Sequence, residues 1–195
     1  MAITDNIRDG QTGLIARASA AVHGGATSVQ LRLKDVAARD LVGVARELIR
    51  SVGVPVLVND RADVAIAAGA AGVHLGADDM PVSAARAIAP TGFIIGASVG
   101  NDGEVAHSVG ADYAGVGPVF ATGSKNDAGD PIGLAEFARL SALIGIPTVA
   151  IGGITPSNAH SAIIAGASGI AVISAVFGST DPLAAARELA SAIGK

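Results

Sequence analysis

Short runs of β-branched and aliphatic residues alternate eight times with alanine-rich segments, and this alternation limits the possible folds more than any other feature. We expect strands at 2–4, 28–33, 55–59, 72–76, 93–98, 113–120, 147–153 and 169–177. We expect helices at 11–23, 38–51, 61–68, 81–89, 102–109, 133–144, 156–165 and 181–194. Alternating strands and helices favour parallel strands joined by right-handed crossovers. Eight such units predict an α/β fold, a single (β/α)8 TIM barrel, over residues 1–195.

An open, doubly wound sheet is the alternative, but that fold gives no reason for a count of eight. Typical barrels have about 250 residues. A chain of 195 residues therefore has little room for insertions. No linker or change of composition marks a second domain. Half of the residues are hydrophobic and only 3% are aromatic, so the core must be built from Ala, Val, Ile and Leu.

Charge and composition exclude several classes of protein. The net charge is −4 and no Lys/Arg run is present, which argues against a nucleic-acid binder. The chain has no cysteine, so disulfides and thiolate metal sites are excluded. The start "MAITDNIRDG" lacks a signal-peptide profile, and no apolar run reaches the roughly 18–20 residues of a membrane span. We therefore expect a cytoplasmic protein that binds no membrane. Exposed apolar helix faces would allow a homo-oligomer, although the sequence locates no interface.

Polar residues gather at the predicted carboxyl ends of the strands, where barrels carry their sites. In "VQLRLK" (29–34), Gln30, Arg32 and Lys34 alternate with apolar residues, so the three share one side of a strand. In a barrel, that side faces the interior, where two cations are unfavourable unless an anionic ligand is bound. A strand with a solvated face in another fold is the alternative.

Asp60 and Asp79 follow neighbouring predicted strands. Two such carboxylates could share Mg2+, which favours a few carboxylates together with phosphate oxygens and water. Alternatively, each aspartate caps the helix that follows it. A nearby cationic strand favours the metal interpretation, because cations and Mg2+ together suit a pyrophosphate.

The segments "AIGGI" (150–154) and "VISA" (172–175) end the last two predicted strands. Loops at these places often bind phosphate through backbone N–H groups, and Gly152 and Gly153 would permit the close approach of an anion. Ordinary turn glycines are the alternative. We expect His74 to be a packed, hydrogen-bonded group rather than a catalyst. A pyrophosphate site and a second phosphate site in one pocket predict two small phosphorylated substrates, or one long one.

Several motifs, in this order, resemble the thiamine phosphate synthase family over nearly the whole chain, from "ITD" at 3–5 to the final helix. They are "VQLRLKD", "VLVNDRADVA", "GVHLGADDMP", "IIGAS", "ADYAGVGPVFATGSK", "IPTVAIGGI" and "GIAVISAV". The resemblance implies a transferase that couples hydroxymethylpyrimidine pyrophosphate to hydroxyethylthiazole phosphate. Its products are thiamine phosphate and pyrophosphate.

The resemblance also implies roles for single residues. Those implied to hold the pyrophosphate are Gln30, Arg32, Lys34 and Asn59, and those implied to hold Mg2+ are Asp60 and Asp79. Ser98 and Lys125 correspond to contacts on the pyrophosphate or pyrimidine side. Thr122 and Ser124 correspond to contacts with the thiazole phosphate, and its phosphate site corresponds to Gly153, Ile173 and Ser174. The residues expected to assist departure of pyrophosphate are Arg32, Lys34 and Lys125.

The chain departs from the family pattern at Leu31 and Leu33, which replace an aromatic residue and a Glu and should point away from the site. It also departs at "VGN" after Ser98 and at "ATGSK" (121–125). We expect residues 121–132 to form a mobile lid, with a solvated surface loop as the alternative. Three rival functions stay open: a thiazole tautomerase-like paralogue, a non-catalytic thiamine- or phosphate-binding barrel, and an unrelated phosphosugar isomerase.

Overall fold

Eight parallel strands follow one another in chain order around a single sheet. The structure, a computed structural model, describes residues 1–5, 7, 9–123 and 129–194. The strands are β1 (Ala2–Ile3), β2 (Val29–Leu31), β3 (Val56–Asn59), β4 (Gly72–Leu75), β5 (Ile94–Val99), β6 (Tyr113–Val116), β7 (Thr148–Ile151) and β8 (Gly169–Ala171). The backbone N–H of Ile3 donates to the Val172 carbonyl at 2.8 Å, and Ala2 bridges to Val172, so the last strand meets the first. The predicted (β/α)8 TIM barrel is confirmed, and the open sheet is excluded.

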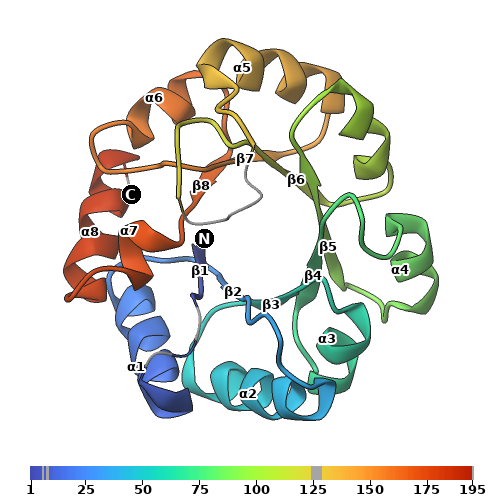
Figure 1. Ribbon diagram of the computed structural model, residues 1–195, viewed down its shortest axis with the longest axis vertical. Helices are drawn as coiled ribbons and strands as arrows, with labels where there is room; N and C mark the ends of the chain where they lie inside the picture. The colour runs from blue at the N-terminus through green and yellow to red at the C-terminus, as the bar shows by residue number, and fades with distance from the viewer. Residues whose placement is uncertain (6, 8, 124–128, 195) are drawn as a thin grey trace.

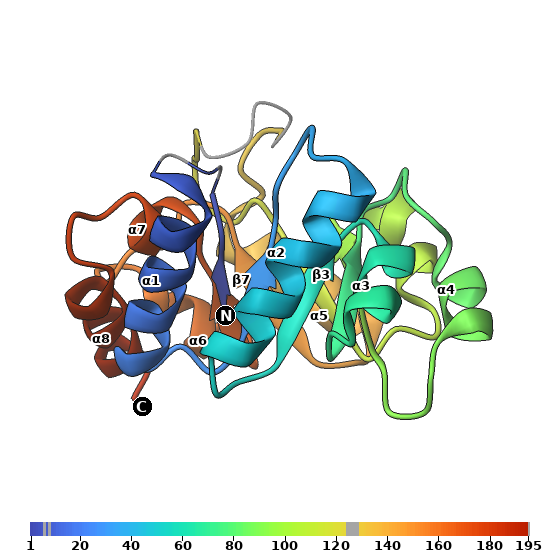
Figure 2. The same ribbon diagram turned by 90° about the horizontal axis from the view of Figure 1, so that it is seen from below.

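Helices surround the ring of strands (Figure 1). They are α1 (Gly10–His23), α2 (Ala38–Ser51), α3 (Ala62–Ala68), α4 (Val82–Ile88), α5 (Gly133–Ile144), α6 (Ala159–Ile164), α7 (Ser174–Phe177) and α8 (Pro182–Ala192), with a 3-10 helix, η1 (Asp102–Ser108). Figure 2 shows the barrel from the side, with α1, α2 and α3 outside the strands. Among the residues that the structure describes, no helix is both long and apolar enough to cross a bilayer.

Burial follows the residue pattern of each element. In α2, the buried residues Leu41, Val44, Ala45 and Leu48 recur at helical spacing and face the barrel. All three residues of β2 are buried, because helices cover one side of the strand and other side chains fill the other. The alternative of a strand with a solvated face is therefore wrong.

Two predicted elements differ in kind from the structure, and the strand predicted at 113–120 ends at Val116. The segment 102–109 is a 3-10 helix rather than an α-helix. Strand β8 ends at Ala171, and Ser174 is the first residue of α7, so the prediction of a strand reaching 177 is wrong. The run "GIAVISAVF" is apolar throughout, and such a run does not distinguish a buried strand from a buried helix.

Candidate active site

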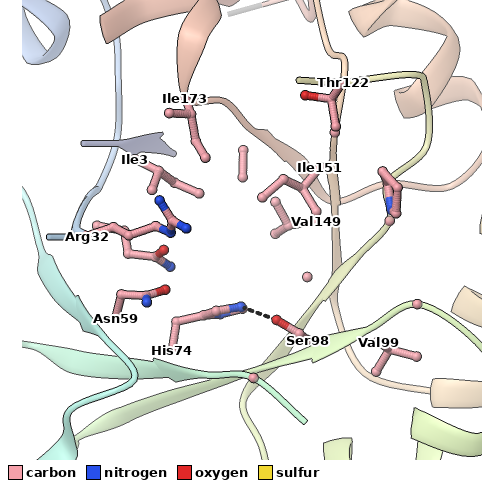
Figure 3. A pocket seen from close by; sticks show the side chains of 18 of the residues that line it. Ile3, Arg32, Asn59, His74, Ser98, Val99, Thr122, Val149, Ile151 and Ile173 are labelled. Atoms are coloured by element: carbon pink, nitrogen blue, oxygen red, sulfur yellow. Dashed lines mark hydrogen bonds between the residues drawn. The ribbon is translucent and has the colours of Figure 1, made fainter. Parts of the chain in front are cut away.

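One pocket of about 630 Å3 opens at the carboxyl ends of the strands (Figure 3). Every predicted site residue that the structure describes lines this pocket. These residues are Gln30, Arg32, Lys34, Asn59, Asp60, Asp79, Ser98, Thr122, Gly153, Ile173 and Ser174. Ser124, Lys125 and the middle of the predicted lid (124–128 of 121–132) lie outside the described residues. The barrel therefore gathers polar groups from seven strand ends around one cavity.

The cationic side of the pocket is built on β2 and β3. Figure 3 shows Arg32 and Asn59 on one side of the cavity and Thr122 on the other. Arg32 is half-buried, whereas Lys34 is exposed at the pocket mouth. The apolar neighbours Leu31 and Leu33 pack in or against the core, so they point away from the pocket as predicted.

A buried threonine holds the backbone of Arg32. The Thr4 hydroxyl accepts a hydrogen bond from the Arg32 N–H at 2.8 Å and donates one to the Arg32 carbonyl at 3.1 Å. Thr4 itself is fully buried. The hydroxyl thus continues the pairing of β1 with β2 beyond the last backbone pair, and it fixes the point from which the Arg32 side chain enters the pocket.

The two aspartates lie at the ends of paired strands, because Asn59 of β3 is opposite His74 of β4. Asp60 has a positive φ of 65°, and its N–H donates to the His74 carbonyl at 2.8 Å. The Asp79 carboxylate accepts from the Gly76 N–H at 2.7 Å through Oδ2. Neither residue is a helix N-cap, since α3 and α4 follow Arg61 and Pro81. The alternative that they cap helices is therefore wrong.

A buried polar cluster forms the floor of the pocket. His74 Nε2 lies 3.0 Å from Ser98 Oγ, and His74 Nδ1 lies 2.9 Å from the Tyr113 hydroxyl. Burial raises the pKa of Tyr113, and the nearby Gln30 side chain acts in the opposite direction. The prediction that His74 is packed and hydrogen-bonded is confirmed. Sequence reasoning missed Tyr113, although it is the only tyrosine of the chain and lies inside the motif "ADY".

The opposite side of the pocket consists of glycine-rich backbone. Gly152 and Gly153 have positive φ angles of 93° and 63°. A Cβ on Gly152 would lie 2.5 Å from the Pro118 side chain, and one on Gly153 would lie 2.4 Å from the Ala121 carbonyl oxygen. The peptide bond between Gly117 and Pro118 is cis. These glycines are therefore needed for packing of the loop after β7 against the segment after β6, whether or not an anion binds there.

Residues 1–176 match the family model described as thiamine monophosphate synthase. The chain belongs to this family. Its membership confirms the resemblance read from the motifs and the prediction of a transferase. Among curated relatives, a thiamine-phosphate synthase from Methanoculleus marisnigri is 53% identical over 90% of this chain and 84% of its own. One from Moorella thermoacetica is 50% identical over 87% of this chain and 83% of its own.

Solved structures agree with this family assignment. A thiamine phosphate pyrophosphorylase from Pyrococcus furiosus is 38% identical, with a TM-score of 0.85 over 98% of this chain and 94% of that one. A 3-hexulose-6-phosphate synthase has a TM-score of 0.73 at 17% identity, covering 99% of each chain. At that identity the likeness concerns the barrel alone, so the activity of that enzyme carries no weight for this family member.

Proposed function

We propose that this chain couples hydroxymethylpyrimidine pyrophosphate to hydroxyethylthiazole phosphate and forms thiamine phosphate. The thiazole nitrogen forms a bond to the exocyclic methylene carbon of the pyrimidine. The bond from that carbon to the pyrophosphate oxygen breaks, and its electron pair leaves with pyrophosphate. One observation carries the proposal: a single pocket combines a cationic side on β2 with a glycine-rich backbone side on β7 and β8.

Arg32 and Lys34 are suited to assist the departure of pyrophosphate. The thiazole nitrogen is already a nucleophile and has no proton to lose, so the reaction needs no general base. Its difficult step is the separation of charge when pyrophosphate leaves a cationic pyrimidine. Positive groups fixed beside the leaving oxygens stabilise the charge that grows there. The barrel supplies these groups from one strand end, with the Arg32 backbone held by Thr4.

Asp60 and Asp79 fit a Mg2+ site. Both carboxylates line the pocket. The bond from Gly76 to one Asp79 oxygen orients that carboxylate, whose second oxygen is suited to a cation. No group of three His, Cys, Asp or Glu residues with metal-site geometry occurs in residues 1–5, 7, 9–123 and 129–194. A site with two carboxylates suits Mg2+, which takes its other ligands from phosphate and water. A Mg2+ held there supplies positive charge to the pyrophosphate oxygens.

The backbone around Gly153, Ile173 and Ser174 is suited to the thiazole phosphate. All three residues line the pocket beside Thr122. Backbone N–H groups recognise phosphate without a charged side chain. Anchoring the phosphate at this side would hold the thiazole ring next to the pyrimidine, so that the two reacting atoms meet in a defined orientation.

The direct test mixes the purified protein with both substrates and Mg2+ and quantifies thiamine phosphate and pyrophosphate. We expect thiamine phosphate and pyrophosphate in equal amounts, and neither of them when the thiazole phosphate is omitted. Isomerisation of a thiazole phosphate without use of the pyrimidine would favour the tautomerase-like alternative. Tight binding of both substrates without turnover would favour a binding protein.

A further inference from the structure

The loop after β7 is held from behind by a side chain that the mechanism proposed above does not use. Asn158 immediately precedes α6, which lies outside the ring of strands (Figure 1), and it does not line the pocket. Its amide nitrogen Nδ2 donates to the Gly153 carbonyl at 2.9 Å, and its Oδ1 accepts from the Thr155 N–H at 2.8 Å. One side-chain amide therefore bridges the two ends of the segment 153–155.

Asn158 occupies the N-cap position of α6 but does not cap that helix. Asn is a favoured N-cap residue because its side-chain oxygen can accept from a backbone N–H of the first turn. All of α6 belongs to the part of the chain that the structure describes, and Asn158 makes no such bond to it. Both ends of the amide turn back to the loop instead, so the side chain serves the loop rather than the helix.

Two successive carbonyl groups of the loop are held by hydrogen bonds. The Gly152 carbonyl accepts from the Phe120 N–H at 3.0 Å, and the Gly153 carbonyl accepts from Asn158. In a planar trans peptide unit, the N–H points away from the C=O. The N–H of Gly153 therefore points away from Phe120. The N–H of Ile154 likewise points away from Asn158.

These two N–H groups belong to residues that line the pocket, Gly153 and Ile154. Within the residues that the structure describes, neither N–H donates to a backbone carbonyl. Successive N–H groups of this kind can form a concave site for an anion. Gly152 and Gly153 have positive φ angles, and glycine alone leaves such a loop free to take other paths. The bonds to the two carbonyls therefore help to fix the direction of both N–H groups.

We propose that Asn158 is a positioning residue, whose amide holds the Gly153 peptide so that the N–H groups of Gly153 and Ile154 face a bound phosphate. The two bonds made by the amide are a property of the chain alone. The identity of that phosphate as the thiazole phosphate rests on the proposed function.

The first test titrates the ligand-free protein with inorganic phosphate, and then with hydroxyethylthiazole phosphate, and follows the 1H–15N signals of Gly153 and Ile154. We expect both amide protons to move downfield, because each donates to the anion. The signal of Gly145, at the other end of β7, should stay in place. Signals of Gly153 and Ile154 that do not move with either ligand would overturn the proposal.

The second test uses two substitutions that keep a helix cap. Asn158→Ser and Asn158→Asp retain a favoured N-cap residue, but neither has an amide N–H for the Gly153 carbonyl. Asn158→Ser also adds no charge near the anion. In both variants, the Kd and the KM for hydroxyethylthiazole phosphate should rise by about three- to tenfold, the effect of losing one hydrogen bond. The kcat and the KM for the pyrimidine pyrophosphate should change little.

Ser157→Ala is the matched control in the same loop. The Ser157 hydroxyl lies 2.9 Å from the Thr155 hydroxyl and bonds there rather than to the Gly153 peptide. Its removal should leave the Kd and both KM values unchanged. Normal affinity in Asn158→Ser, or an equal loss of affinity in Ser157→Ala, would overturn the role of the amide. The titration of the unsubstituted protein decides the proposal even if a variant at 158 does not fold.

The outcomes also separate this proposal from the proposed function. Phosphate bound at the Gly153 and Ile154 N–H groups, with affinity lost in Asn158→Ser but no thiamine phosphate formed, would support the proposal and contradict the function. Normal coupling with unmoved signals of these two residues would support the function and overturn the proposal.

Discussion

The two sides of the pocket present different chemical groups on the same barrel. The side on β2 to β4 presents charged side chains: Arg32, Lys34 and the two aspartates. The side on β7 and β8 presents backbone, with glycines at positive φ packed against the segment after β6. Charge on the first side can be changed without altering the chain path. On the second side, the chain path depends on Gly152 and Gly153, so substitution of either one also affects the packing of two loops.

The largest effect should come from removing a cation. Arg32→Ala and Lys34→Ala should each lower kcat by about 10²–10³, the usual loss when a stabiliser of growing charge is deleted. Steady-state assays of thiamine phosphate formation measure this directly. Arg39→Ala, an exposed charge in α2, is the matched control and should be neutral. Near-normal kcat in both pocket variants would remove the pyrophosphate assignment.

Loss of either aspartate should weaken Mg2+ use without removing the site. Asp60→Asn and Asp79→Asn should lower the apparent Mg2+ affinity by at least about 10–100-fold, the range seen when groups supporting a metal are lost. Asn also tolerates the left-handed backbone of Asp60. Binding of Mn2+ with pyrophosphate, followed by electron paramagnetic resonance, gives a readout besides activity. Asp63→Asn removes the same charge from α3 and should have no effect; unchanged metal binding in both pocket variants would contradict the site.

A methyl group on the backbone side should act on one substrate only. Gly153→Ala forces a left-handed residue to carry a Cβ 2.4 Å from the Ala121 carbonyl oxygen. We expect the free energy of unfolding to fall by about 1–3 kcal/mol. KM for the thiazole phosphate should rise by about tenfold, equivalent to about 1.4 kcal/mol of binding. KM for the pyrimidine pyrophosphate should not change.

Gly43→Ala is the control for that comparison, because a Cβ at Gly43 in α2 meets no atom within 4 Å. An equal rise of both KM values in Gly153→Ala would mean that the two sides of the pocket are not separate.

The smallest effect concerns the backbone beneath the charged side. Thr4→Val removes the hydroxyl that bonds the Arg32 N–H and carbonyl, and it leaves both groups without that partner. The free energy of unfolding should fall by about 1–3 kcal/mol, and kcat should fall less than in Arg32→Ala. Denaturant titration and kinetics measure the two quantities. Thr4→Ser keeps the hydroxyl and should restore both; a normal kcat in Thr4→Val would show that Arg32 needs no such anchor.

The sequence was sufficient for the barrel because eight short β-branched and aliphatic runs alternate with helical segments. It was sufficient for the charged side because Arg32 and Lys34 alternate with apolar residues at the end of a predicted strand, although both lie just beyond β2 in the structure. It did not reveal that Tyr113 belongs to the buried polar cluster. Its partner His74 is 39 residues away in the chain, and the two side chains meet only once the barrel has formed. The sequence suggested an anion site at the glycine pair, and that assignment stays a prediction. The packing of the pair against Pro118 was not predicted, because it depends on the path of another loop. The apolar run at 169–177 did not reveal where α7 begins, because a buried strand and a buried helix both favour such a run.

The closure between the first and last strands has a consequence for synthesis of the chain on the ribosome. Ile3 bonds to the Val172 carbonyl, so the pocket wall between β8 and β1 cannot exist until nearly the whole polypeptide has been made. Domains generally fold as units during translation. A nascent chain that stops before Val172 would hold Arg32 beside an open seam, without the segment after β8 that contains Ile173. Truncated products of this chain should therefore lack a complete pocket. The two proposed substrate sites should then form together, late in synthesis.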